Sequence, residues 1–434
     1  MTTDLDLSLP HPDPGPGWRL RFWTFFAGQG LSLVGSALTQ FVLIWWITDT
    51  TGSASALALA GTAALLPQAL LGPLAGALAD RWNRRLLLMV SDAVSALCMI
   101  VLIALFLADA IALWHAYTLM AVRSAMQAIQ APAAAASTPL LVPVEFLPRA
   151  AGLNQTLQGV MTIAAAPLGA LAIAFMPIGW ALSIDVATAA LAILTLFFLR
   201  IPPTAKSAGG GNLLLEIRDG FEVVWRHRGL RSLYFVLACT VLVVMPSFTL
   251  VALLVKAYFG GGANEVALME ALTGAAMIVA GIVVATLAPR RPVRWIIFGF
   301  AISCFAVAGT AAPPAPWFWV SVVAWTISGF AFVCGSAPLT ALLQTVVPNR
   351  LQGRAFALLT TVTGLAAPIG MAAAGPLGEA IGIRGLFLAM GVGGGLIALA
   401  GYLSPSIRAL DDVAPGPGDG DTDLRLDPRP DAPH

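Results

Sequence analysis

Four charged side chains lie inside long apolar stretches of this sequence, where burying a charge is costly. Arg123 lies about ten residues into the stretch 113–136, which at about 1.5 Å per residue places it roughly 15 Å deep, near the middle of a bilayer. An arginine at that depth costs about 2.5–3.5 kcal/mol to insert, so it requires a partner or a water-filled cavity. Arg123 is therefore predicted either to take part in proton coupling or to pin helices together.

Three carboxyl groups share this setting. Glu270 lies near the start of the stretch 265–288 and is followed by the uncharged run ALTGAAMIVAGIVV. A carboxyl in such surroundings can bind and release a proton near neutral pH, although Glu270 would instead be partly hydrated if it lies at the outer end of its helix. Asp185 and Asp92 lie at shallow depths from opposite faces, and each is predicted as a proton carrier or as an interhelical hydrogen-bonding residue.

Uncharged polar residues recur at helical spacing in two segments. Gln29, Ser32, Ser36 and Gln40 are separated by three or four residues, and so are Arg123, Gln127 and Gln130. Such spacing places the members of each set on one face of a helix, although ordinary helix packing explains any single member equally well. The two sets predict polar stripes on otherwise apolar helices.

The elements that carry these residues are predicted to be transmembrane helices. The chain has 434 residues, of which 58% are hydrophobic and 10% charged, with a mean hydropathy of +0.86. Apolar stretches long enough to cross a bilayer recur along the chain. We predict an all-α integral membrane protein with twelve transmembrane helices, at 22–47, 54–79, 86–108, 113–136, 150–176, 178–199, 231–257, 265–288, 295–312, 317–347, 355–381 and 385–403.

Charge sets the predicted domain limits and orientation. Most of the 23 Lys and Arg residues fall on the side of both termini, the exceptions being Arg123, Lys256 and Arg384. By the positive-inside rule that side is cytoplasmic, which predicts a multi-pass protein of the plasma (inner) membrane. The predicted parts are an N-terminal tail (1–21), a six-helix half (22–199), a cytoplasmic central loop (200–230), a second half (231–403) and a disordered tail (404–434).

The two halves repeat one another at an offset of about 200 residues, a signature of internal duplication. Pro167 and Gly169 in the fifth predicted helix match Pro368 and Gly370 in the eleventh. Since six helices separate equivalent positions, the halves are predicted to be parallel repeats related by an axis along the membrane normal, which is typical of transporters. The four matched residues are predicted to be helix hinges or close-packing points.

The loop between the second and third helices, GPLAGALADRWNRRLLL, resembles the signature loop of the major facilitator superfamily. Asn83 stands where the superfamily usually has glycine, and this departure resembles the drug-proton antiporter branch that contains macrolide-efflux proteins. The arginine motif of the fourth helix keeps Arg123 without its glycines, and Ala166 replaces a glycine of the antiporter motif in the fifth. The residues that match the loop motif are Gly76, Leu78, Asp80, Arg81, Arg84 and Arg85.

The resemblance implies how the candidate residues are used. The superfamily arranges its first, fourth, seventh and tenth helices around a central cavity, which implies a cavity lined by the two polar stripes and by Met245, Phe248, Trp325 and Phe332. An aromatic pocket with few polar anchors suits bulky amphipathic molecules. Gly76, Asp80, Arg81, Arg84 and Arg85 would form a cytoplasmic gate against the start of the eleventh helix, unless the arginines only set topology.

The resulting functional prediction is proton-coupled efflux of hydrophobic or amphipathic compounds, with macrolide-like drugs first, by alternating access. The alternatives are export of an endogenous metabolite or siderophore, and a non-transporting membrane sensor. Neither Lys206 nor Lys256 follows glycine, and the four histidines are scattered, so neither ATP hydrolysis nor enzyme catalysis is expected. We expect no cofactor, metal or nucleic-acid partner, a monomer in the lipid bilayer, and a proton gradient as the energy source. The cysteines, Cys98, Cys239, Cys304 and Cys334, show no metal or redox spacing.

Overall fold

The computed structural model describes residues 15–199, 225, 227–347 and 349–413. Within these ranges the chain is helical and contains no strand. Most of the predicted N-terminal tail, of the central loop 200–230 and of the C-terminal tail lies outside the described residues, so the limits of those three parts stay predictions.

The first half, here called the N-half, contains six long helical segments. They are α1 (Trp18–Thr51), α2 (Ala54–Arg81), α3 (Arg84–Leu107), α4 (Leu113–Leu141), α5 (Leu147–Phe175) and the pair α6 (Ile178–Ala181) and α7 (Ser183–Phe198), with a short turn η1 (Val144–Phe146) before α5. Ser53 accepts from the backbone N–H of Ala56, and Asn83 from that of Leu86. These side chains cap the starts of α2 and α3, so the sharp turns between the first three helices follow from local sequence.

The second half, the C-half, repeats this order. It consists of α9 (Arg228–Phe259), α10 (Ala263–Leu287), α11 (Pro292–Ala311), η2 (Ala315–Trp317), α12 (Phe318–Val346), α13 (Asn349–Leu403), α14 (Pro405–Arg408) and α15 (Leu410–Val413). α13 is broken at Gly382, where φ is 75°, a left-handed conformation that glycine adopts without strain. It therefore consists of two helical arms joined at one residue.

Nine helices of the described ranges are long and apolar enough to cross a membrane, or ten if the bent α5 is one span. α13 counts once although Gly382 divides it. α4 is absent from that count, and its apolar character is reduced by Arg123, Gln127, Gln130 and two prolines. With α4 and the second arm of α13 included, the helices are consistent with the predicted twelve crossings.

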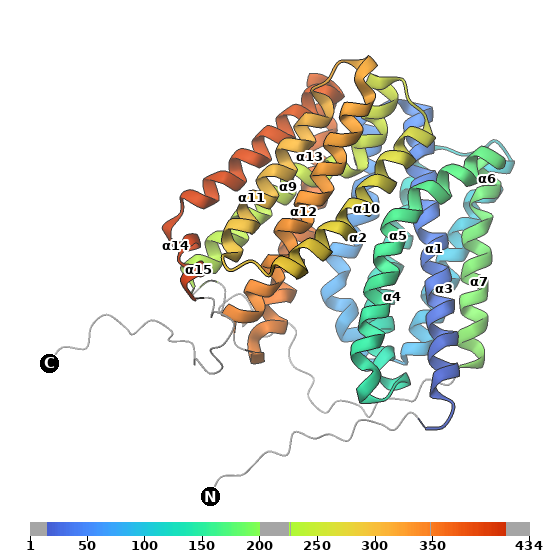
Figure 1. Ribbon diagram of the computed structural model, residues 1–434. Helices are drawn as coiled ribbons and strands as arrows, with labels where there is room; N and C mark the ends of the chain where they lie inside the picture. The colour runs from blue at the N-terminus through green and yellow to red at the C-terminus, as the bar shows by residue number, and fades with distance from the viewer. Residues whose placement is uncertain (1–14, 200–224, 226, 348, 414–434) are drawn as a thin grey trace, which may run out of the picture.

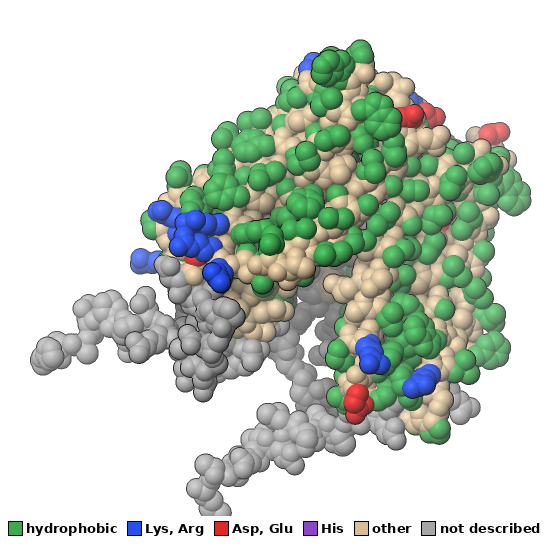
Figure 2. Space-filling model, in the orientation of Figure 1, with side chains coloured by type: hydrophobic (Ala, Val, Ile, Leu, Met, Phe, Trp, Pro, Cys, Tyr) green, Lys and Arg blue, Asp and Glu red, His purple; other side chains and the backbone are tan. Residues whose placement is uncertain are grey.

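The described parts of the two halves lie side by side and pack against each other toward one face. α2 packs against the first arm of α13, and α5 against α10. Figure 1 shows the halves converging where α1 and α9 end and separating where α1 and α9 begin. We call the side where the halves converge the far face. We call the side where they separate the terminal face, because α1 starts and α15 ends there. Figure 2 shows a hollow between the halves on the terminal face.

Small residues allow the halves to approach at the far face. A Cβ on Gly375 of α13 would lie 3.0 Å from the Cβ of Ala58 on α2, and one on Gly274 of α10 would lie 2.9 Å from the Cα of Ile163 on α5. Helices in membranes associate largely through such close backbone contacts, since lipid offers no hydrophobic driving force. Both halves carry many exposed apolar side chains, and Figure 2 shows them spread over one side of the molecule, as expected of a surface that faces lipid.

The matched glycines of the repeat occupy equivalent interfaces. A Cβ on Gly169 of α5 would lie 2.5 Å from Cδ1 of Phe41 on α1, and one on Gly370 of α13 would overlap the carbonyl oxygen of Leu242 on α9. Both therefore let the fifth helix of a half pack closely on its first. α5 bends by 43° just before Ile163, about one turn ahead of Pro167, where a proline removes a backbone hydrogen bond.

Candidate functional site

A cavity of about 460 Å³ lies in the N-half between α1, α4 and α5, toward the terminal face. Of the predicted polar stripes, Gln29, Ser32, Ser36, Gln127 and Gln130 lie in its wall, whereas Gln40 does not. Asn154, Gln155 and Gln158 were not predicted as wall residues, although their helical spacing places them on one face of α5. The other wall residues include Phe22, Phe25, Phe26, Leu33, Gln68, Asn154, Gln155, Leu157 and Gln158.

Asp92 lies directly behind this wall on α3, with only 2% of its surface exposed. Its Oδ1 accepts hydrogen bonds from Oγ of Ser32 at 3.1 Å and from Nε2 of Gln130 at 2.7 Å. Its Oδ2 is buried and has no hydrogen-bond partner among the described residues. Asp92 is thus connected to the cavity through two side chains that line it.

Arg123 of α4 and Asp185 of α7 form a buried ion pair. Nη2 of Arg123 lies 3.2 Å from Oδ2 of Asp185, and the two side chains are 6% and 5% exposed. The angle at this contact is not that of a hydrogen bond, and Nη1 of Arg123 points to Sδ of Met99 at 3.9 Å. Oγ of Ser36 donates to Oδ1 of Asp185 at 3.5 Å, which links this pair to the cavity wall as well.

Close packing brings these helices together. A Cβ on Gly35 of α1 would lie 2.8 Å from Oδ1 of Asp185, so only glycine lets α7 approach α1 at this level. Asp185 is also close enough to Asp92 for the two carboxyls to interact electrostatically. We call Asp92, Arg123 and Asp185, with Ser32, Ser36 and Gln130, the polar cluster.

The polar cluster holds two carboxyls and one guanidinium. The Arg123 charge is matched by Asp185, whereas no cation within the described ranges contacts Asp92. An ionised carboxylate inside a membrane protein needs a compensating charge or a bound proton. Asp92 can therefore take up one positive charge, either a proton or a cationic group entering from the cavity.

Glu270 lies apart from the polar cluster, on α10 of the C-half. Its Oε1 and Nε1 of Trp325 on α12 are both buried without a hydrogen-bond partner in the described part of the chain. The indole is nevertheless close enough to the carboxyl to interact with it. The structure therefore places the four proton-coupling candidates in two separate groups, three in the N-half and one in the C-half.

The predicted aromatic residues of the cavity lie in the C-half and do not line the N-half cavity. Trp325 is fully buried, with its ring centroid 5.4 Å from that of Phe248, and Phe248 lies 6.3 Å from Phe332. Met245 is half-buried on α9. The three rings pack against one another across α9 and α12.

Two of the predicted gate residues contact the N-half at the terminal face. Nη1 of Arg84 donates to the carbonyl oxygen of Ala136 at 2.7 Å, and Nε and Nη2 of Arg85 donate to those of Leu196 and Phe197 at 2.7 and 2.5 Å. Cations near the last carbonyls of a helix are stabilised by its dipole, so the Arg85 contacts secure the end of α7, while Arg84 joins the start of α3 to α4. The side chains of Gly76, Asp80 and Arg81 lie outside the described residues.

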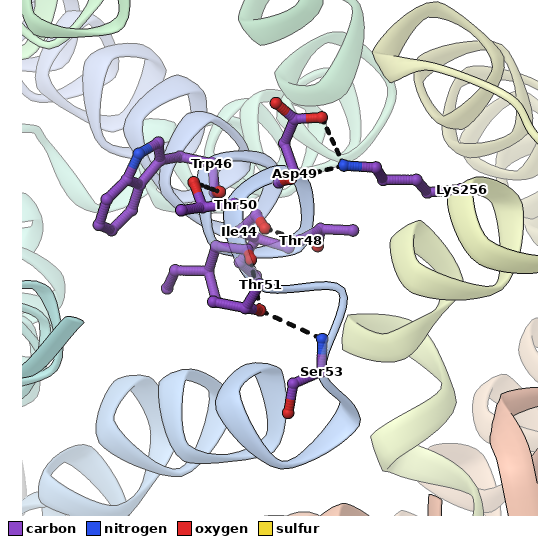
Figure 3. Close-up of polar contacts among 9 residues, drawn as sticks. Ile44, Trp46, Thr48, Asp49, Thr50, Thr51, Ser53 and Lys256 are labelled. Atoms are coloured by element: carbon purple, nitrogen blue, oxygen red, sulfur yellow. Dashed lines mark hydrogen bonds and ion pairs between the residues drawn. The ribbon is translucent and has the colours of Figure 1, made fainter. Parts of the chain in front are cut away.

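Polar contacts across the far face, which were not predicted from the sequence, join the two halves. Nζ of Lys256 on α9 donates to Oδ1 and to the carbonyl oxygen of Asp49 on α1, both at 2.6 Å, as Figure 3 shows. Oε1 of Glu379 on α13 accepts from Oγ of Ser53 at 2.6 Å and from the backbone N–H of Ser55 at 3.2 Å. We call these the far-face contacts, and they close the side of the protein opposite the cavity mouth.

Comparisons with known proteins agree with this architecture. The sequence matches the Major Facilitator Superfamily over residues 25–366 and 233–425. It is 30% identical over 398 residues to Macrolide efflux protein A of Streptococcus pyogenes, which covers 91% of this chain and 98% of that protein. It is 26% identical over 420 residues to the Multidrug efflux pump Tap of Mycobacterium tuberculosis, covering 92% and 96%.

Solved structures share the fold at low sequence identity. A bacterial homolog of the human lysosomal transporter Spinster, in an inward-facing and unoccupied conformation, superimposes with a TM-score of 0.70 at 15% identity, over 92% of this chain and 98% of that one. The nucleoside transporter NupG gives a TM-score of 0.65 at 12% identity, over 89% and 98%. The resemblance first seen in the loop between the second and third helices is confirmed, and the chain belongs to the major facilitator superfamily of membrane transporters.

Proposed function

We propose that this protein exports hydrophobic or amphipathic compounds, macrolide-like drugs among them, in exchange for protons. The observation that carries the proposal is the polar cluster, which places an uncompensated carboxyl, Asp92, behind the wall of a cavity. The names of the relatives in Streptococcus and Mycobacterium support the substrate class. The proton gradient supplies the energy, and no cofactor is needed.

The cavity wall suits an amphipathic molecule. The half-buried ring of Phe26, with the buried rings of Phe22 and Phe25 in the same wall, offers aromatic surface near the terminal face, and amide side chains offer hydrogen bonds deeper in. A bulky compound can bury its apolar part against the rings while the amides orient its polar groups. A proton on Asp92 and a substrate in the cavity would compete through Ser32 and Gln130, because both side chains contact the carboxyl and line the cavity.

Alternating access would follow from the two faces. The far-face contacts hold the halves together on one side while the cavity opens on the other, which we assign to the cytoplasm of a protein in the plasma membrane with both termini inside. Breaking the far-face contacts and closing the terminal face would present the same cavity to the outside. Arg84 and Arg85 belong to the region that would close, as part of the proposed cytoplasmic gate.

The test is flux in proteoliposomes containing the full chain, a labelled macrolide and an imposed proton gradient. We expect accumulation that a protonophore abolishes. Asp92→Asn should lose gradient-driven accumulation but still equilibrate substrate, because its amide cannot carry a proton. Asp109→Asn is the matched control, since Asp109 is an exposed carboxylate with φ of 48°, a conformation that asparagine also adopts.

Three other outcomes would indicate a different coupling site, substrate class or function. Gradient-driven transport retained by Asp92→Asn and lost by Glu270→Gln would move coupling to the C-half. Transport of an endogenous metabolite or siderophore but not of a macrolide would replace the substrate class, and binding without any flux would indicate a sensor.

A further inference from the structure

A second hollow of the molecule lies outside the transport machinery described above. It is a groove of about 690 Å³ in the C-half, between α9 and the two arms of α13, near the terminal face. We call it the C-half groove. Phe235 and Val236 of α9, Leu358 and Val362 of the first arm, and Ile397 of the second arm form its long apolar part.

This groove faces the bilayer. Phe235, in its wall, is 70% exposed, and Leu396 and Leu403 on the adjoining arm are 57% and 76% exposed. Apart from Trp225, which precedes α9, its described wall residues belong to the C-half and none lines the N-half cavity, so the two hollows are separate. An apolar groove that opens to the bilayer is filled by an apolar molecule from the same leaflet. Water is excluded because it would find no hydrogen-bond partners there.

The end of the groove at the terminal face is polar and positive. Arg231 is exposed, and its guanidinium lies 5.3 Å above the ring of Trp225, with Ser232 and Ser404 beside it in the wall. Arg408 on α14 lies close by, 5.9 Å over the ring of Tyr402. Neither arginine has an acidic partner in the part of the chain that the structure describes.

An occupant must therefore combine a long apolar chain with an anionic head at the membrane surface. Basic residues at this depth attract acidic lipid headgroups, and a tryptophan ring is favoured at the same level. We propose that the C-half groove binds one acidic phospholipid, with an acyl chain along Phe235 and Ile397 and its phosphate at Arg231. This site is independent of the proposed transport reaction.

Native mass spectrometry of the full chain with phosphatidylglycerol and phosphatidylcholine tests the proposal. We expect one phosphatidylglycerol to be retained preferentially, and Arg231→Ala to weaken its retention about fivefold, the effect of one basic residue near a charged headgroup. Arg290→Ala removes the same charge from an exposed residue of the same face outside the groove, and should leave retention unchanged. Ala400→Trp fills the groove without changing charge, because Ala400 is exposed in its wall, and should abolish retention.

Three results would overturn the proposal. Equal losses in Arg231→Ala and Arg290→Ala would mean that only general surface charge attracts the lipid. Equal retention of phosphatidylcholine would mean an apolar groove without a headgroup site. Displacement of the lipid by soluble glycerol phosphate, with Ala400→Trp unaffected, would mean a surface anion site that does not use the groove.

Discussion

The ion pair between Arg123 and Asp185 gives the sharpest prediction about stability. Both side chains are about 95% buried, and their charged atoms are 3.2 Å apart. Removing one member of a buried pair leaves the other charge unmatched and typically costs about 3–5 kcal/mol. We expect Asp185→Asn to fall in this range, because Arg123 would keep only the weak contact with Met99 and an arginine cannot shed its charge.

Arg123→Met should cost less than Asp185→Asn. The carboxyl left behind can bind a proton, and a methionine at position 123 would pack beside Met99, which already lies next to the guanidinium. The double variant Arg123→Met/Asp185→Asn contains no charge at this point, so it should recover most of the stability lost in Asp185→Asn. The free energy of unfolding measured by denaturant titration in micelles compares the four proteins.

The order of the four free energies of unfolding tests whether the two charges compensate each other. If Arg123→Met were the least stable of the four proteins, or if the double variant lost the sum of the single losses, the pair would not be the mutually compensating contact described above. Asp109→Asn serves again as the control, and its unfolding should match that of the unchanged protein.

Three further predictions concern other contacts. Gly370→Ala should destabilise the protein by about 1–3 kcal/mol, because the new methyl group meets the main-chain carbonyl of Leu242. Gly169→Ala should destabilise it less, because its methyl group meets the side chain of Phe41, which can move. Thermal unfolding compares the two variants, and equal effects would contradict this difference in packing. Lys256→Ala should increase the reactivity of a cysteine placed in the N-half cavity toward a reagent added on the far face, because one far-face contact is lost. The reversed pair Asp49→Lys/Lys256→Asp should restore protection of that cysteine. Unchanged labelling in Lys256→Ala would refute the view that this ion pair helps to close the far face. Arg85→Ala should lower the free energy of unfolding by about 1–3 kcal/mol through the loss of its hydrogen bonds to the end of α7, and Arg290→Ala, which should have no effect, is the control.

Much of the fold could be predicted from the sequence because lipid leaves few alternatives. Apolar length identified most helices directly, and matched residues such as Pro167 and Pro368 identified the two halves. The same holds for α4, predicted at 113–136, although its polar face lowers its hydropathy because Arg123 and Gln130 point toward other helices instead of lipid. Helical spacing also grouped Gln29, Ser32 and Ser36 correctly on one face, since that follows from the geometry of a single helix.

Partners between helices could not be predicted in the same way. The contacts of Arg123 with Asp185 and of Gln130 with Asp92 depend on how four helices are oriented relative to one another. Gly35 contributes to that orientation because it lets α7 approach α1 closely. The sequence marked Lys256 as a charge outside the positive face without indicating Asp49 as its partner. Each of these contacts spans dozens of residues along the chain, so no local spacing encodes it.

The far-face contacts have a mechanical consequence. Lys256 binds the last turn of α1 and Glu379 binds the first turn of α2, and only Gly52 and Ser53 separate these helices. Besides the packing of α2 on α13 and of α5 on α10, the C-half thus holds the N-half through polar contacts at the turn between α1 and α2. α1 has 34 residues and is about 50 Å long at about 1.5 Å per residue, and it carries Gln29, Ser32 and Ser36 toward the terminal face. A displacement of the turn between α1 and α2 would therefore be transmitted along α1 to the cavity wall, through a helix that the C-half contacts at its far end.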